Sequence, residues 1–221
     1  MRPFPIFLEP PGGTTAAPSG AAAAAAQPTA PRPRAGQRGW VPGEPGLWVF
    51  LLGDMTMFGV FFVAFLVQRG EDPATFAHSR EALTVAVGAI NTVVLLTSSL
   101  LVALAVRAHR DGARERSRGL VAGAAACGAL FAVIKVAEWA TKLADGHHPD
   151  SDLFFTYYYL LTGVHFLHVL IGGCVLTFWL RRLGRAPRAG EERVVEGCAS
   201  YWHMVDLLWV VLFPVLYLSA T

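Results

Sequence analysis

The sequence predicts an all-α polytopic membrane protein, folded as a bundle of five transmembrane helices. Hydrophobic residues make up 54% of the 221 residues, charged residues only 15%, and the mean hydropathy is +0.45. A soluble domain of this size carries more charge. Runs of about 20 apolar residues are long enough to cross a bilayer as helices. Five such runs occur, at residues 46–68, 82–107, 120–142, 154–180 and 197–220.

The arginines are sorted between the loops, and this predicts the orientation. They gather before the first run and after the second and fourth runs. They are Arg2, Arg32, Arg34 and Arg38, then Arg107, Arg110, Arg114, Arg116 and Arg118, then Arg181, Arg182, Arg185, Arg188 and Arg193. Because basic loops stay in the cytoplasm, we expect a cytoplasmic N-terminus and a C-terminus outside. The orientation in the membrane explains where the arginines occur. The net charge of +2 therefore does not indicate a nucleic-acid partner.

Two domains are expected. Residues 1–45 are rich in proline and alanine and predict a disordered cytoplasmic tail, whereas residues 46–221 form the five-helix transmembrane domain. In the first run Asp54 lies about 12 Å from the cytoplasmic end at 1.5 Å per residue. Unpaired, it would stay neutral at that depth; paired with His203, it would stay ionised. The phenylalanines that follow Asp54 predict contacts with lipid or other helices.

The second and third runs carry polar residues in the middle of apolar sequence. Asn91 adds hydrogen-bonding capacity to the second run. In the third, Lys135 and Glu138 are three residues apart and can neutralise each other, which favours an ion pair in the outer half of the membrane. Glycines and alanines between Gly119 and Gly128 predict close packing of this helix against another.

The fourth run places His165 and His168 on one helix face. A pair of this spacing can bind a metal or a haem iron. A further ligand set such as H-E-x-x-H is absent from the sequence, so we expect hydrogen-bonded interior histidines and no metal.

The last run brings His203 and Asp206 into the membrane on one face. Ionisable groups at this depth persist when they face partners, and they usually mark a working interior. The pair either specifies helix packing or serves as a proton relay or ligand site. Depth along the helices predicts one layer of Asp54, His203 and Asp206, with His168 just above it. A second layer holds Lys135, Glu138 and His165.

Catalytic and cofactor-attachment patterns are missing from the sequence. We find no nucleophile–base–orienter set, no glycine-rich phosphate loop and no C-x-x-C-H. The chain is therefore expected to be non-catalytic.

Several motifs, taken together, point to a known family. They are G-L-W at 46–48 with G-D at 53–54, A-I-N-T at 89–92, A-E-W at 137–139, T-G-V-H-F-L-H-V at 162–169, and E-G at 196–197 followed by Y-W-H-M-V-D-L-L-W at 201–209. In this order and at matching helix positions, they resemble the cytochrome c oxidase subunit 3 family, which is subunit III of the haem-copper terminal oxidases. The resemblance covers the chain from about residue 46 onward.

The resemblance implies a non-catalytic accessory subunit of a bacterial haem-copper respiratory complex in the inner (plasma) membrane. Its partner would be a haem-containing catalytic subunit, and the chain itself would bind phospholipid but no redox cofactor. The family is thought to support assembly, oxygen delivery and proton uptake. Asp54 stands at the family's buried carboxylate, and further family polar positions are matched. These are Glu138, His165, His168, His203 and Asp206.

Two features depart from the best-known members. Mitochondrial-type members have seven spans, whereas this chain resembles the last five, and Lys135 stands where a neutral residue is expected. The five-helix form with G-D-M points towards the branch that accompanies nitric oxide reductases in denitrifying bacteria. The alternative function is a stand-alone proton-coupled transporter that uses Asp54, Glu138 and Asp206 as carriers. Transporters usually have broken helices and inverted repeats. The sequence shows no inverted repeat, and Pro214 is its one sign of a broken helix.

Overall fold

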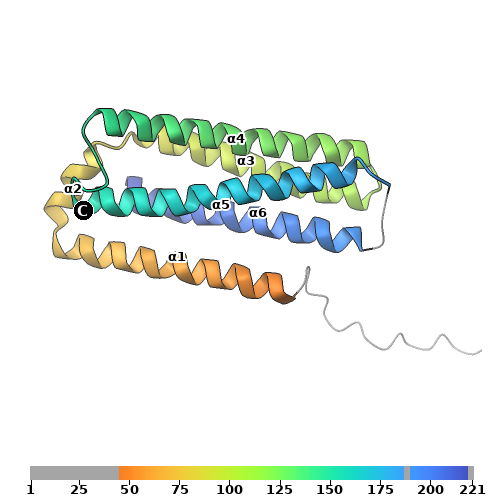
Figure 1. Ribbon diagram of the computed structural model, residues 1–221, viewed down its shortest axis with the longest axis horizontal. Coiled ribbons are helices and arrows are strands. Elements are labelled where there is room, and N and C mark those ends of the chain that lie inside the picture. The colour runs from red at the N-terminus through yellow and green to blue at the C-terminus, as the bar shows by residue number, and fades with distance from the viewer. Residues whose placement is uncertain (1–44, 187–189, 219–221) are drawn as a thin grey trace, which may run out of the picture. The chain divides into compact units, whose positions relative to one another are not determined.

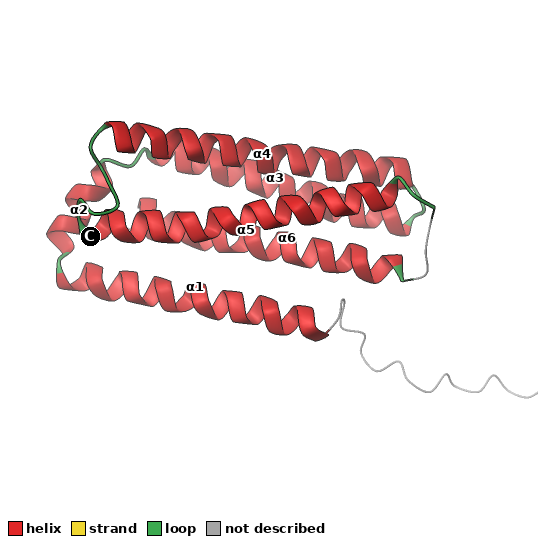
Figure 2. Cartoon of the chain, viewed as in Figure 1, coloured by secondary structure: helices red, strands yellow, loops and turns green. Residues whose placement is uncertain are grey.

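The computed structural model describes residues 45–186 and 190–218, and every regular element in these ranges is a helix (Figure 2). The elements are α1 (Pro45–Glu71), α2 (Pro73–Glu81), α3 (Val85–Arg110), α4 (Arg114–Ala144), α5 (Leu153–Leu183), α6 (Glu191–Phe213) and the π-helix η1 (Pro214–Leu218). Five of these helices are long and apolar enough to cross a membrane, with α6 and η1 forming the fifth. The predicted five-helix, all-α fold is confirmed. The predicted disordered tail lies almost entirely outside the described residues, and the orientation stays a prediction.

α6 is the helix around which the others are arranged. It packs against α1, α3 and α5, while α4 packs against α3 and α5. Figure 1 shows α1 along one side of the bundle, with α5 and α6 between it and the α3–α4 pair. α1 is held by its phenylalanines, because Phe58 and Phe65 are buried and their rings meet those of α2 and α5.

α2 is an element that the apolar runs did not predict. Asp72 begins it by accepting a hydrogen bond from the backbone N–H of Thr75 at 3.2 Å, and Pro73 takes the first helical position. Hydrogen bonding from the side chain and backbone of Thr75 lowers the pKa of Asp72. The Ser79 hydroxyl donates to Asp152 at 2.6 Å, which ties α2 to the start of α5. A helix of nine residues is too short for its periodicity to stand out in the sequence.

The last spanning helix differs from its predicted form at both ends. α6 begins at Glu191, six residues before the apolar run at 197–220. At the other end, at Pro214, the backbone changes to the π-helix η1. Proline has no N–H and cannot continue the α-helical hydrogen bonds, which accounts for the change. The Arg80 guanidinium donates to the carbonyl of Tyr217 at 3.2 Å and so ties η1 to α2.

Trp202 of α6 fills the centre of the bundle. A Cβ added at Gly128 of α4 or at Gly172 of α5 would lie 2.7 Å from its ring, so only glycine fits at either position. The indole N–H donates to Ser98 Oγ at 3.0 Å. That hydroxyl in turn donates to the carbonyl of Ala124 at 2.9 Å. The close packing predicted for the glycine-rich half of α4 is confirmed at Gly123, which meets Leu101, and at Gly128, which meets Trp202, but not at Gly119, where a Cβ would meet nothing.

Candidate functional site: the polar interior

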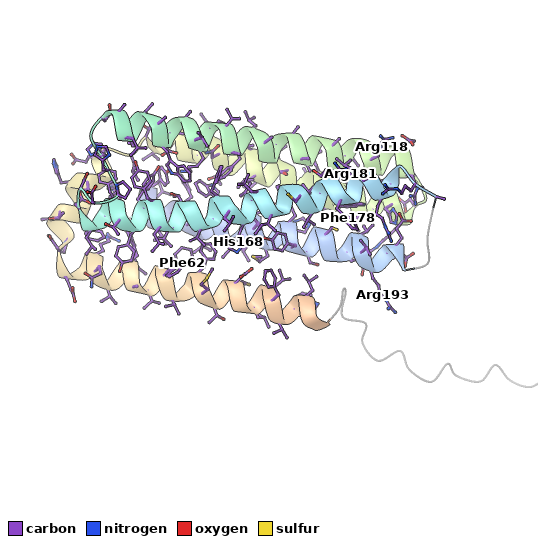
Figure 3. The ribbon with its side chains drawn as sticks, viewed as in Figure 1. Phe62, Arg118, His168, Phe178, Arg181 and Arg193 are labelled. Atoms are coloured by element: carbon purple, nitrogen blue, oxygen red, sulfur yellow. The ribbon has the colours of Figure 1, made fainter. Side chains whose placement is uncertain are left out.

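Asp54 of α1 is paired with His168 of α5. Asp54 Oδ2 lies 3.4 Å from His168 Nε2, and both side chains are largely buried. Figure 3 shows His168 on the side of α5 that faces α1. His168 Nδ1 lies 2.8 Å from the carbonyl oxygen of Val164. A carbonyl only accepts, so Nδ1 carries a hydrogen. The contact with Asp54 is an ion pair when Nε2 carries a hydrogen as well, and within the described residues Asp54 Oδ2 makes no hydrogen bond.

His203 does not pair with Asp54, so that interpretation of the sequence is wrong. His203 Nδ1 lies 2.7 Å from the Ser99 hydroxyl of α3. Asp206, one turn further along α6, is buried and also close to Ser99. Within residues 45–186 and 190–218, however, its carboxylate makes no hydrogen bond of good geometry. Depth along a helix gives the level of a side chain but not the neighbour that it faces. His203 faces α3 rather than α1.

Lys135 and Glu138 of α4 form a buried ion pair that includes Tyr217 of η1. Lys135 Nζ donates to Glu138 Oε2 at 2.9 Å and to the Tyr217 hydroxyl oxygen at 2.8 Å. The Tyr217 hydroxyl donates to Glu138 Oε1 at 2.6 Å and closes the triangle. The predicted pair is confirmed. The third member was missed because Tyr217 reaches Glu138 from η1, whose irregular helix the spacing of the sequence does not indicate.

Aromatic rings surround the Lys135 ammonium as well. Nζ lies 4.8 Å from the ring centroid of Trp209, 5.3 Å from that of Tyr217 and 5.4 Å from that of Tyr158. Such contacts stabilise a cation that has left water. The Lys135 side chain has no exposed surface. Its charge is therefore balanced by one carboxylate and screened by three rings.

His165 and Asn91 are buried without hydrogen-bond partners among the described residues. Both ring nitrogens of His165 and both amide atoms of Asn91 are in this state. The His165 ring packs instead against Phe131 and Trp209, with centroids 5.6 and 5.1 Å away. The prediction of hydrogen-bonded interior histidines therefore holds for His168 and is wrong for His165.

Two pairs at the arginine-rich end were not predicted. Arg114 at the start of α4 donates to both carboxylate oxygens of Glu191 at 2.9 and 3.1 Å. It also donates to three carbonyls around the end of α5. Arg110 donates to Glu196 at 2.8 Å. The acidic residues Glu191 and Glu196 in an otherwise basic segment were the signal from which these pairs could have been predicted. The pairs also explain why α6 extends back to Glu191.

The polar residues thus gather in three places. Asp54 meets His168, Lys135 meets Glu138 and Tyr217, and His203 and Asp206 meet Ser99. In the ranges that the structure describes, no three or more His, Cys, Asp or Glu side chains are grouped so that they could hold a metal ion. The arrangement places charged and polar side chains from different helices next to one another inside the bundle.

Comparisons with known proteins agree on one family. The family described as Cytochrome c oxidase subunit III matches residues 43–221. The chain is 32% identical over 176 residues to a cytochrome c oxidase subunit 3 of Thermostichus vulcanus, covering 78% of this chain and 85% of the relative. It is 28% identical over 177 residues to a cytochrome bo(3) ubiquinol oxidase subunit 3 of Pseudomonas putida, covering 78% and 84%.

A third relative is much longer than this chain. The heme-copper oxidase subunit I+III of Aeropyrum pernix is 30% identical over 185 residues. That match covers 78% of this chain but 22% of the relative, so this chain spans about a fifth of that protein.

Proposed function

Because this chain belongs to the cytochrome c oxidase subunit III family, we propose that it is the non-catalytic accessory subunit of a bacterial haem-copper respiratory complex. The observation that carries the proposal is the extent of the match. It includes all five spanning helices and each interior pair described above. The redox centres would lie on a haem-containing catalytic subunit, and this chain would support the assembly of that subunit and its access to protons or oxygen.

The Aeropyrum relative supports such a partner. Its name joins subunit I and subunit III in one chain, and parts that are fused in one protein often form a complex when they are separate. In our proposal the catalytic partner reduces oxygen, as in cytochrome c oxidases, or nitric oxide, as in denitrifying bacteria. The complex would lie in the bacterial inner membrane, with the arginine-rich ends of the helices in the cytoplasm.

The Asp54–His168 pair supports a proton-linked role. It brings a carboxylate that is 15% exposed within 3.4 Å of an imidazole that is 9% exposed. An imidazole and a carboxylate can exchange a proton at little cost. We propose that the pair buffers protons near the catalytic subunit, with His203 and Asp206 as further polar positions. Glu138 and His165 would contribute mainly to the packing of the bundle.

Phospholipid is the ligand that we propose for an apolar cavity between α1, α5 and α6. The cavity has a volume of about 670 Å³ and is lined by Leu47, Phe50, Ile171, Val175, Gly190, Arg193, Val194, Gly197, Cys198 and Tyr201. Arg193 is its charged lining residue and can meet a lipid phosphate, while the remaining side chains fit acyl chains.

Affinity purification from native membranes in a mild detergent tests the proposal. We expect a haem-containing catalytic subunit to co-purify with the tagged chain, and the chain separated from it to show no haem absorbance. Oxygen and nitric oxide consumption by the complex would distinguish the two kinds of partner. Recovery of the chain alone would contradict the proposal. Movement of a solute with protons in reconstituted vesicles would favour the transporter alternative.

A further inference from the structure

Three arginines without a carboxylate partner surround a cavity between the start of α4 and the end of α5. The cavity has a volume of about 690 Å³, and Arg118, Arg181 and Arg185 line it together with Glu115, Gly119, Ala122, Thr177, Leu180 and Gly184. Figure 3 shows Arg118 and Arg181 at the same end of the bundle, on α4 and α5. One glutamate faces three arginines, so the cavity carries a net positive charge.

These arginines differ from the other basic residues at this end. Arg110 and Arg114 are held by Glu196 and Glu191. The guanidinium groups of Arg118, Arg181 and Arg185 make no hydrogen bond or ion pair with the described part of the chain, although the backbone carbonyl of Arg185 accepts from Arg114. Like charges that lie close together repel one another unless an anion joins them. The cavity therefore has the charge to bind an anion from outside the chain.

The same two helices continue this cavity as an apolar groove towards the middle of the bundle. A second hollow of about 280 Å³ follows it, and Thr177 lines both. Small residues from α4 and α5 form much of its walls, with the Trp202 ring at one side. These residues are Ala125, Gly128, Ala129, Ala132, Gly173 and Cys174. The groove has the length and apolar character to accept an acyl chain that begins at the arginines.

We propose that the α4–α5 groove binds an anionic phospholipid, with its phosphate between Arg118, Arg181 and Arg185 and an acyl chain along the small residues. Basic pockets between transmembrane helices are a recognised form of lipid head-group site. A free phosphate would leave the apolar part of the groove empty. A zwitterionic lipid would leave the net charge of the cavity unbalanced. This site lies on the opposite side of α5 from the cavity lined by Arg193, and it does not depend on the proposed function.

Lipid binding to the full chain, measured by native mass spectrometry in detergent, tests the charged part of the site. The probes are dioleoyl phosphatidylglycerol and dioleoyl phosphatidylcholine. We expect a preference for phosphatidylglycerol, and an increase in its Kd of about tenfold in a variant with Arg118→Gln and Arg181→Gln. The matched control carries Arg107→Gln and Arg116→Gln, two exposed arginines of the same end that line neither cavity, and its Kd should stay unchanged. Equal increases in both variants, or equal binding of the two lipids, would overturn the proposal.

The groove is tested by filling it. Ala129→Phe places a ring in the groove and should abolish phosphatidylglycerol binding. Ala126→Phe, an exposed alanine of α4 outside the groove, should not. If Ala129→Phe left binding unchanged, the arginines would bind only a free anion and the proposal would be wrong. If it released the catalytic subunit from the complex while the lipid stayed bound, the groove would be a subunit interface, and the proposal would also be wrong. The lipid-binding measurements themselves use this chain alone, so failure of the lipid proposal is distinguishable from failure of the proposed function.

Discussion

Replacing Glu138 with alanine is expected to lower the free energy of unfolding by about 3–5 kcal/mol, because it leaves a buried charge without its partner. The Lys135 ammonium has no exposed surface, and Glu138 is its carboxylate partner. The Tyr217 hydroxyl would lose its acceptor in the same variant. The three rings around Nζ stabilise the cation, but they do not neutralise it. Denaturation of the purified chain in mixed micelles, followed by tryptophan fluorescence, measures the loss.

Two control variants separate the buried charge from the loss of side-chain volume. The double variant Lys135→Met with Glu138→Gln removes both charges and keeps an acceptor for Tyr217, so we expect stability close to that of the unmodified chain. Lys142→Met breaks a contact of 3.9 Å with the exposed Asp145 and should cost less than about 1 kcal/mol. If the double variant were as unstable as Glu138→Ala, the ion pair would not be the cause.

Replacing His168 with leucine is expected to lower the free energy of unfolding by about 1–3 kcal/mol, because it leaves the buried Asp54 side chain without its partner. The substitution removes the group that faces Asp54 Oδ2 at 3.4 Å. Asp54→Asn should be much milder. The asparagine amide can donate to His168 Nε2, which is free to accept when Nδ1 carries the hydrogen. The same denaturation experiment measures both variants, and the yield of assembled complex gives a second readout.

His203→Leu provides the comparison for this pair. It removes a contact with the Ser99 hydroxyl at 2.7 Å and leaves Asp54 paired. We therefore expect a smaller loss than for His168→Leu, and a coupling energy between positions 54 and 168 that is absent between 54 and 203. Coupling of Asp54 to His203 instead would mean that the helices are arranged differently from the structure described here.

The sequence predicted those features that depend on one helix at a time. Hydropathy gave five spans because lipid requires long apolar helices whatever their neighbours are. The Lys135–Glu138 pair was predictable because residues three apart on a helix are always neighbours. The glycines of α4 indicated close packing in the same way, although not that Trp202 would fill the gap.

Features that depend on how helices meet were not predictable. Depth placed Asp54 in one layer with His203 and Asp206, but α1 packs so that Asp54 meets His168. Tyr217 reaches Glu138 only because the backbone after Pro214 is a π-helix. His165 shares a face with His168, yet its neighbours are the rings of Phe131 and Trp209 rather than polar groups. The direction in which a side chain points from its helix predicts its partners only when the neighbouring helices are known.

Lys135 and Glu138 are paired with each other inside the bundle, away from its surface. Magic-angle-spinning NMR tests this pairing directly, because the chain has only two lysines, Lys135 and Lys142. In a sample with ¹⁵N-labelled lysine and ¹³C-labelled glutamate, the variant Lys142→Gln leaves the Lys135 ammonium as the lysine signal. We expect a distance of about 4 Å or less between Lys135 Nζ and the carboxylate carbon of Glu138, as a direct hydrogen bond requires. A Lys135 signal without this coupling, in exchange with water, would contradict the pairing.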